Sequence, residues 1–121
     1  MSRKTTAHLA KMLQVLSDPT RLAVFDLLMQ GVQCNCELGD KLQLPMNLIS
    51  HHLKVLRDAG LVNAERDPQD ARWVYYSVRQ PTLNQLREEL SAFMDPRRIQ
   101  PRQPSCGPRL IVAEGVRERG R

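Results

Sequence analysis

The chain has 121 residues, of which 41% are hydrophobic and only 4% aromatic, so we expect a single domain with one modest core of aliphatic side chains and methionine. No apolar run approaches the roughly 18 residues of a membrane span, and no basic-then-apolar leader opens the chain, so we expect neither membrane insertion nor secretion. The three cysteines are an odd number, and two of them lie too close together for an easy disulfide, which favours a reduced, cytoplasmic compartment.

The net charge of +5 is concentrated near the end of the chain. Residues 1–94 contain 11 lysines and arginines against 10 acidic residues, whereas residues 95–121 contain 7 arginines against 3 acidic residues. Because the first segment is almost neutral, its charge alone does not predict nucleic-acid binding. Such a function has to rest on motifs and on the local placement of charge.

Two helices are predicted before residue 32. The first carries an apolar stripe at the spacing i, i+3, i+4 and i+7, formed by Leu9, Met12, Leu13 and Leu16. Asp18 followed by Pro19 is typical of a helix start, and Gly31 is placed to end this second helix in a left-handed conformation. The apolar residues that we expect the second helix, 19–30, to bury are Leu22, Phe25, Leu28 and Met29.

A pair of short helices is predicted next. The third helix runs from about residue 35 to Leu42, and the fourth runs from Pro45 or Met46 to Ala59, where Gly60 stops it. Only the turn at 43–45 separates them. Two short helices joined in this way form a helix-turn-helix, which presents its second helix to the major groove of DNA.

After residue 60 the pattern changes to strands. The runs 61–66 and 72–78, joined by a turn at 67–71, predict a β-hairpin, and a hairpin directly after a reading helix is a wing. A last helix is predicted from Thr82 to Met94. Its apolar stripe, which would suit dimerisation with the first helix of a second subunit, consists of Leu83, Leu86, Leu90 and Phe93.

These elements define the predicted fold and its boundaries. The fold class is mainly α with a small β-hairpin, a winged helix-turn-helix in a single domain over residues 1–94 that forms a homodimer. Residues 95–121 hold four of the eight prolines and show no sustained period, so we expect a largely disordered, Pro/Arg-rich tail that carries Cys106.

Three segments of this chain resemble a known family. They are LSDPTRL at 16–22, LISHHLKVLRDAGLV at 48–62 and RWVYY at 72–76, of which the second is the most specific. Together with the order of elements over residues 8–94, they resemble the arsenical-resistance repressor (ArsR/SmtB) family of winged-helix metal sensors. The resemblance implies a transcriptional repressor that binds operator DNA as a dimer, with no enzymatic activity and no organic cofactor.

The arsenic-sensing branch of that family carries Cys-x-Cys-Asp/Glu-Leu at the start of its third helix, and Cys34-Asn35-Cys36-Glu37-Leu38 matches this motif. The best-known pattern has a third cysteine three residues later, where this chain has Gly39. Trivalent arsenic and antimony favour three sulfur ligands, and Cys106 is the only other cysteine. We therefore expect Cys34, Cys36 and Cys106 to bind arsenite or antimonite, which would act as inducer.

Other interpretations of the thiol pair remain open. Cys34 and Cys36 can be ordinary small core residues, but their polar neighbours predict an exposed helix start, where the pKa of a thiol is lowered. Cadmium, lead or oxidation of the pair are alternative signals on the same fold. A small dithiol oxidoreductase is a weaker alternative, because such enzymes carry Cys-x-x-Cys on a βαβ frame and neither is present.

The fourth helix has one polar face and one apolar face. The side chains suited to base edges or phosphates are Asn47, Ser50, His51 and Lys54. On the opposite face we expect Ile49, Leu53 and Leu56 to be buried, and His52 to pack rather than to bind metal. In the wing, Arg66 and Arg72 are predicted phosphate contacts, although a solvated surface charge explains either of them equally well.

Overall fold

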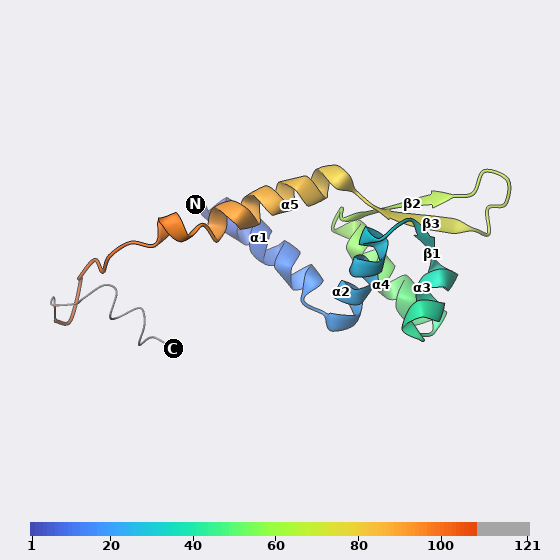
Figure 1. The fold of residues 1–121 in the computed structure, drawn as a ribbon, viewed down its shortest axis with the longest axis horizontal. Coiled ribbons are helices and arrows are strands. Elements are labelled where there is room, and N and C mark those ends of the chain that lie inside the picture. The colour runs from blue at the N-terminus through green and yellow to red at the C-terminus, as the bar shows by residue number, and fades with distance from the viewer. Residues whose placement is uncertain (109–121) are drawn as a thin grey trace.

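The computed structural model describes residues 1–108 (Figure 1). Its elements are, in chain order, α1 (Arg3–Leu16), α2 (Pro19–Met29), β1 (Gln33–Cys34), α3 (Asn35–Leu42), α4 (Met46–Asp58), β2 (Val62–Arg66), β3 (Val74–Val78), α5 (Gln80–Phe93) and the 3₁₀ turn η1 (Pro96–Arg98). The predicted winged helix-turn-helix is confirmed. Among the helices of residues 1–108, none combines the length and apolarity that crossing a membrane requires.

Local signals in the sequence fix where the helices begin and end. The Asp18 carboxylate accepts hydrogen bonds from the backbone N–H groups of Thr20 and Arg21, at 2.9 and 3.0 Å, at the start of α2. Gly60, with φ of 79°, follows the end of α4 as predicted. Gly31 has φ of 153°, which favours glycine but lies outside the left-handed helical region predicted for it.

The sheet has three antiparallel strands in the order β1-β3-β2. The predicted hairpin is β2 and β3, with Val62 opposite Val78 and Arg66 opposite Val74. The third strand, β1, was not predicted because two residues are too few to show an alternating pattern. It pairs Cys34 with Tyr75, so the residue just before α3 is joined to the wing.

The core lies where α2, α3 and α4 meet the base of the sheet. Its fully buried side chains are Val24, Leu38, Ile49, Leu53, Leu56 and Leu61. They include the whole apolar face predicted for α4, and the nearby His52 is also buried, as expected. The polar face of α4 is therefore turned outward by the packing of the opposite face.

The prediction for the buried face of α2 was partly wrong. Phe25 and Leu28 are buried, but Leu22 and Met29 are 49% and 52% exposed, and Val24 is buried in their place. The apolar side chains of α2 are distributed all round the helix, so their spacing does not identify one buried face. Packing against α4 selects the face that carries Val24 and Phe25.

The segment after α5 remains structured slightly beyond the predicted domain end at residue 94. The Asp95 carboxylate caps η1 by accepting a hydrogen bond from the Arg97 N–H at 2.9 Å, and the Arg98 guanidinium lies 5.2 Å from the centre of the Phe93 ring. Residues 99–108 contain no helix or strand. The remainder of the predicted disordered tail, 109–121, lies outside the described residues.

Candidate functional site

The two neighbouring thiols lie at the N-terminus of α3. Cys34 is the extended residue before the helix, and its backbone N–H donates a hydrogen bond of 2.8 Å to the carboxylate of Glu37 in the first helical turn. Cys36 lies inside that turn and is half-buried. Cys34 and Cys36 are separated by one residue at this helix start, so a single ion can draw both sulfurs onto itself.

The expectation of an exposed, acidic thiol was wrong for Cys34. Its side chain is only 3% exposed, and the residue lies in β1, which pairs with β3. Burial raises the pKa of the Cys34 thiol, and the neighbouring Cys36 thiol acts in the same direction, whereas the backbone N–H of Glu37 opposes both. Cys34 is therefore a protonated thiol that has to lose its proton when it binds a metal.

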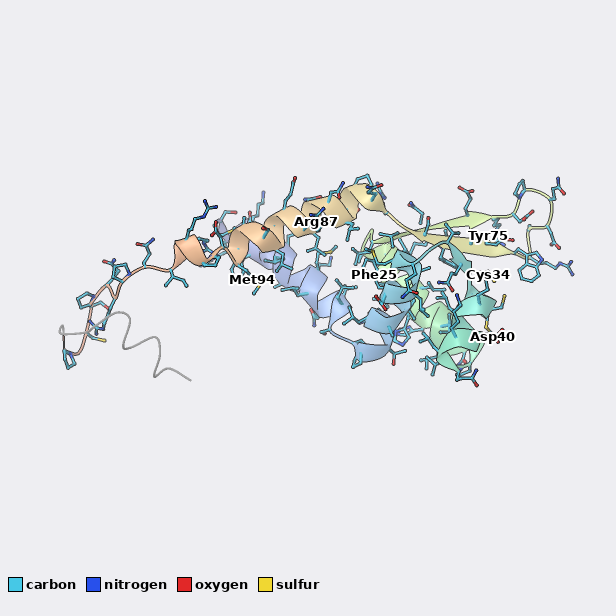
Figure 2. All side chains as sticks on the ribbon, viewed as in Figure 1. Phe25, Cys34, Asp40, Tyr75, Arg87 and Met94 are labelled. Atoms are coloured by element: carbon cyan, nitrogen blue, oxygen red, sulfur yellow. The ribbon has the colours of Figure 1, made fainter. Side chains whose placement is uncertain are left out.

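Tyr75 lies beside the thiol pair. It is the cross-strand partner of Cys34, and Figure 2 shows both residues where the sheet meets α3. Burial raises the pKa of the Tyr75 phenol, and the negative charges of Asp67 and Glu37 add to that shift. The site therefore has a neutral phenol at its wing side.

A hollow of about 470 Å³ opens on the other side of Cys36. It lies between α3 and the start of α4, and Asp40 and Met46 also line it. Gly39, whose missing side chain leaves room there, is itself buried: a Cβ at that position would lie 3.2 Å from the Met46 Sδ atom and 3.2 Å from the Leu44 carbonyl oxygen. A cysteine side chain at position 39 would thus lie beside the Met46 thioether.

Cys106 is not brought to this site. It is exposed in the segment beyond η1, which extends away from α5 on the side opposite the wing (Figures 1 and 2). Within residues 1–108, no three His, Cys, Asp or Glu side chains are grouped closely enough to hold a metal ion. For Cys106 to act as the predicted third ligand, the tail therefore has to fold back or to reach a second subunit.

The polar residues predicted to read DNA are all exposed on α4: Asn47, Ser50, His51 and Lys54. The Lys54 ammonium forms an ion pair of 3.0 Å with Asp58 one turn later, and both side chains are mostly exposed. Pairs of this kind are weak, so Lys54 can exchange Asp58 for a phosphate. The arrangement suits a helix lying in a groove.

The two wing arginines are exposed but already engaged within the hairpin. The Arg66 guanidinium donates to the Ala71 carbonyl oxygen at 2.6 Å, and the Arg72 guanidinium makes a bidentate contact with Asp70 at 2.9 and 2.7 Å. Both contacts hold the turn between β2 and β3. Phosphate binding by Arg66 or Arg72 remains a prediction, and it would compete with these contacts.

Sequence reasoning missed two residues of the thiol site, Tyr75 and Met46. Tyr75 joins it only through a two-residue strand, which leaves no periodic signal. Met46 approaches Gly39 only because α3 and α4 pack closely around the tight turn between them. The glycine in the middle of α3 was the one available signal, since glycine in a helix is unfavourable without a reason in packing.

Comparison with known proteins places this geometry among transcriptional regulators. Residues 18–64 match the family described as bacterial regulatory protein, arsR family. An arsenical resistance operon repressor of Staphylococcus aureus is 34% identical over 84 residues, which cover 69% of this chain and 78% of that protein. A cadmium resistance regulatory protein CadC homolog of Staphylococcus aureus is 27% identical, covering 82% and 78%. The crystal structure of a possible transcriptional regulator for arsenical resistance superposes with a TM-score of 0.59 at 36% identity, covering 67% and 81%.

Proposed function

Because this chain belongs to the arsR family of bacterial regulatory proteins, we propose that it is a homodimeric repressor that releases its operator when arsenite or antimonite binds Cys34 and Cys36. The family consists of DNA-binding repressors that respond to metal or metalloid ions, and they are not enzymes. The observation that carries the ion assignment is the placement of two free thiols, one residue apart, at the start of α3.

The chemistry of arsenite fits the thiols of Cys34 and Cys36. Each thiol that displaces a hydroxyl group of As(OH)₃ forms one As–S bond and releases one water, with no change in oxidation state. Cys34 and Cys36 can replace two hydroxyl groups, and a third thiol is needed to replace the last. We propose that Cys106, from the tail of the same chain or of its partner, supplies that third sulfur.

The position of Cys34 suggests how binding reaches the DNA-contacting elements. Cys34 belongs to β1, which pairs with the wing strand β3, and it also begins α3, which packs on α4. Drawing its sulfur and that of Cys36 onto one ion would change both connections. A coupling free energy of about 1–3 kcal/mol between ion and operator binding is the usual range for such a switch.

The DNA contacts follow from the exposed face of α4. In the proposed complex Asn47, Ser50 and His51 face base edges, while Lys54 and the wing arginines Arg66 and Arg72 contact phosphates. Two copies of α4 in a dimer would enter successive major grooves roughly 34 Å apart on a palindromic operator.

A second candidate keeps the fold and changes the ion to cadmium or lead. The similarity to the CadC homolog favours it, because that relative is named for cadmium resistance. Oxidation of the thiol pair would be a third signal on the same two residues. Release of operator DNA by each ion in turn, with reductant present, separates these candidates.

The test of the proposed function is arsenite titration of the wild-type protein and of Cys34→Ser and Cys36→Ser, following DNA release in a gel-shift assay. Both variants are expected to bind operator as the wild type does, because neither thiol lies on the exposed face of α4. Neither should release it with arsenite. An unchanged arsenite response in both variants would remove the site assignment.

A further inference from the structure

Met46 is the first residue of α4 and borders the same hollow as Cys36. Its side chain is 41% exposed, so it contributes little to the core. Methionine has three rotatable side-chain bonds and a polarisable sulfur, which lets an exposed thioether shift onto a neighbouring ligand at small cost.

Gly39 sets the position of this thioether relative to the thiols. Cys36 and Gly39 are three residues apart in α3, so they lie on the same face of the helix. The Met46 Sδ atom is 3.2 Å from the point where a Cβ of residue 39 would lie. It therefore lies next to the helix face that carries Cys36, in space that any larger residue at 39 would occupy.

Cys34 completes the group. It lies two residues before Cys36, immediately before the first turn of α3, and Cys36 shares the hollow with Met46. Two cysteines and one methionine thus lie at α3 and the start of α4, and no movement of the tail is needed to bring their sulfurs onto one ion. We propose that Cys34, Cys36 and Met46 form a three-sulfur site for a soft monovalent cation of the Cu(I) or Ag(I) class.

Charge and donor type distinguish this ligand from arsenite. Thiolate and thioether donors together suit Cu(I), which is soft and needs no hydroxyl group to be displaced. Binding of Cu(I) releases two protons from Cys34 and Cys36, uses a lone pair of Met46 and transfers no electrons. The complex carries one negative charge. Arsenite gains little from Met46, because a neutral thioether has no proton with which to release hydroxide as water.

The inference rests on the thiol pair of the proposed function but is tested without DNA. Cu(I) would be titrated into the reduced full-length protein against a chromophoric Cu(I) chelator. The comparison is between wild type, Met46→Leu and the matched control Met29→Leu, since Met29 is also exposed but lies on α2. Met46→Leu should weaken Cu(I) binding by about tenfold or more, equivalent to ~1.4 kcal/mol, and Met29→Leu should change it by less than about twofold.

X-ray absorption at the copper edge gives the second measurement. Three sulfur neighbours are expected in the wild type and in Cys106→Ser, and two in Met46→Leu. Circular dichroism checks that each variant keeps its helices. Unchanged Cu(I) affinity and three sulfurs in Met46→Leu would overturn the proposal, as would loss of the third sulfur in Cys106→Ser.

The two proposals fail separately. If arsenite does not release DNA from the wild type but Met46→Leu loses Cu(I) affinity, the arsenite function is wrong and the three-sulfur site stands. If Met46→Leu retains Cu(I) affinity but the cysteine variants lose arsenite response, the reverse holds. Met46→Leu is expected to respond to arsenite as the wild type does.

Discussion

His52 shows how strongly one side chain depends on its surroundings, because the adjacent His51 is exposed while His52 is buried. The Arg21 guanidinium lies 3.4 Å from its Nδ1 atom. Burial lowers the pKa of the His52 imidazole. The carboxylate of Asp18 opposes that shift, and the positive charges of Arg21 and His51 reinforce it. The folded protein therefore holds a neutral imidazole on the buried face of α4.

The neutral state of His52 makes stability depend on pH. In the unfolded chain the imidazole has its ordinary pKa of 6.5, so below that pH the unfolded state binds a proton that the folded state resists. The free energy of unfolding should decrease as pH falls from about 7.5 to about 5.5, where Asp18, whose pKa is lowered, stays ionised. In His52→Gln the free energy of unfolding, measured by urea denaturation, should decrease less over the same pH range. An equal decrease in both proteins would assign the effect to other groups.

The outcome for the thiols shows what residue-level reasoning from the sequence could and could not reach. The motif around Cys34 and Cys36 correctly located them at the start of a helix. Their polar neighbours predicted exposure, and this was wrong for Cys34 because its burial depends on a strand far along the chain. Contacts between distant segments leave no trace in local spacing, and the approach of Met46 to Gly39 is another example.

At the scale of elements, α4 was the most predictable because several independent signals agree. Its apolar face, the proline before it and Gly60 after it all indicate the same helix, and the structure places its end within one residue of the prediction. The α2 helix lacks that agreement, since its apolar residues point in all directions, and the contact with α4 decides which of them are buried. The two-residue strand β1 forms because its backbone pairs with β3, which lies far along the chain.

The exposed face of α4 is expected to carry sequence recognition. Replacing Ser50 and His51 together by alanine removes two side chains that can reach base edges, while the buried face remains unchanged. Specific operator binding should be abolished, and binding to unrelated DNA should remain. Fluorescence anisotropy measures the ratio of the affinities for operator and for unrelated DNA. If the double variant still preferred the operator, another element would be the reader.

Lys54 and Asp58 give a separate prediction for phosphate contact. Lys54→Ala should weaken binding to all DNA sequences and reduce the salt dependence by about one phosphate contact. Asp58→Asn is the matched control, because it frees Lys54 from its 3.0 Å ion pair and removes a negative charge near the DNA. It should bind all sequences slightly more tightly. Equal effects of the two substitutions would exclude a direct phosphate contact of Lys54.

At the scale of the whole molecule, the proposed sensing site and the proposed dimer interface are separated. Figure 1 shows α1 and α5 side by side at one end, with the wing at the other, and their packing includes a hydrogen bond of 2.9 Å between His8 and Glu89. The thiol site lies near the wing. The tail that carries Cys106 leaves from the far end of α5, so within one chain it begins far from the ions it is proposed to bind (Figure 2).

Cys106 is expected to contribute to the arsenite response without being essential. The entropy cost of closing a loop grows slowly with its length, so a tail can bring a thiol to a distant site. Cys106→Ser should require more arsenite for DNA release, leave operator affinity unchanged and lower the average number of sulfur neighbours of arsenic from three to two. Truncation after Arg98, which retains η1, should have the same effect on release. Three sulfurs retained in Cys106→Ser would exclude this residue as the third ligand.

The proposed dimer makes its own prediction at the end of the molecule opposite the wing. Phe93, on α5, is 41% exposed, a large apolar surface for the single chain and a suitable centre for an interface with a second copy. Phe93→Glu should leave the fold intact, because the ring is not in the core and Arg98 beside it can pair with the new carboxylate. Sedimentation should then give the mass of one chain, 13.9 kDa, where the wild type gives twice that value. Since a single subunit contacts only one half-site, operator affinity should fall by about a hundredfold or more.

Val32→Glu is the control, as Val32 is 64% exposed next to β1, away from α5. If Phe93→Glu still sediments as a dimer with full operator affinity, the α5 surface is not the interface.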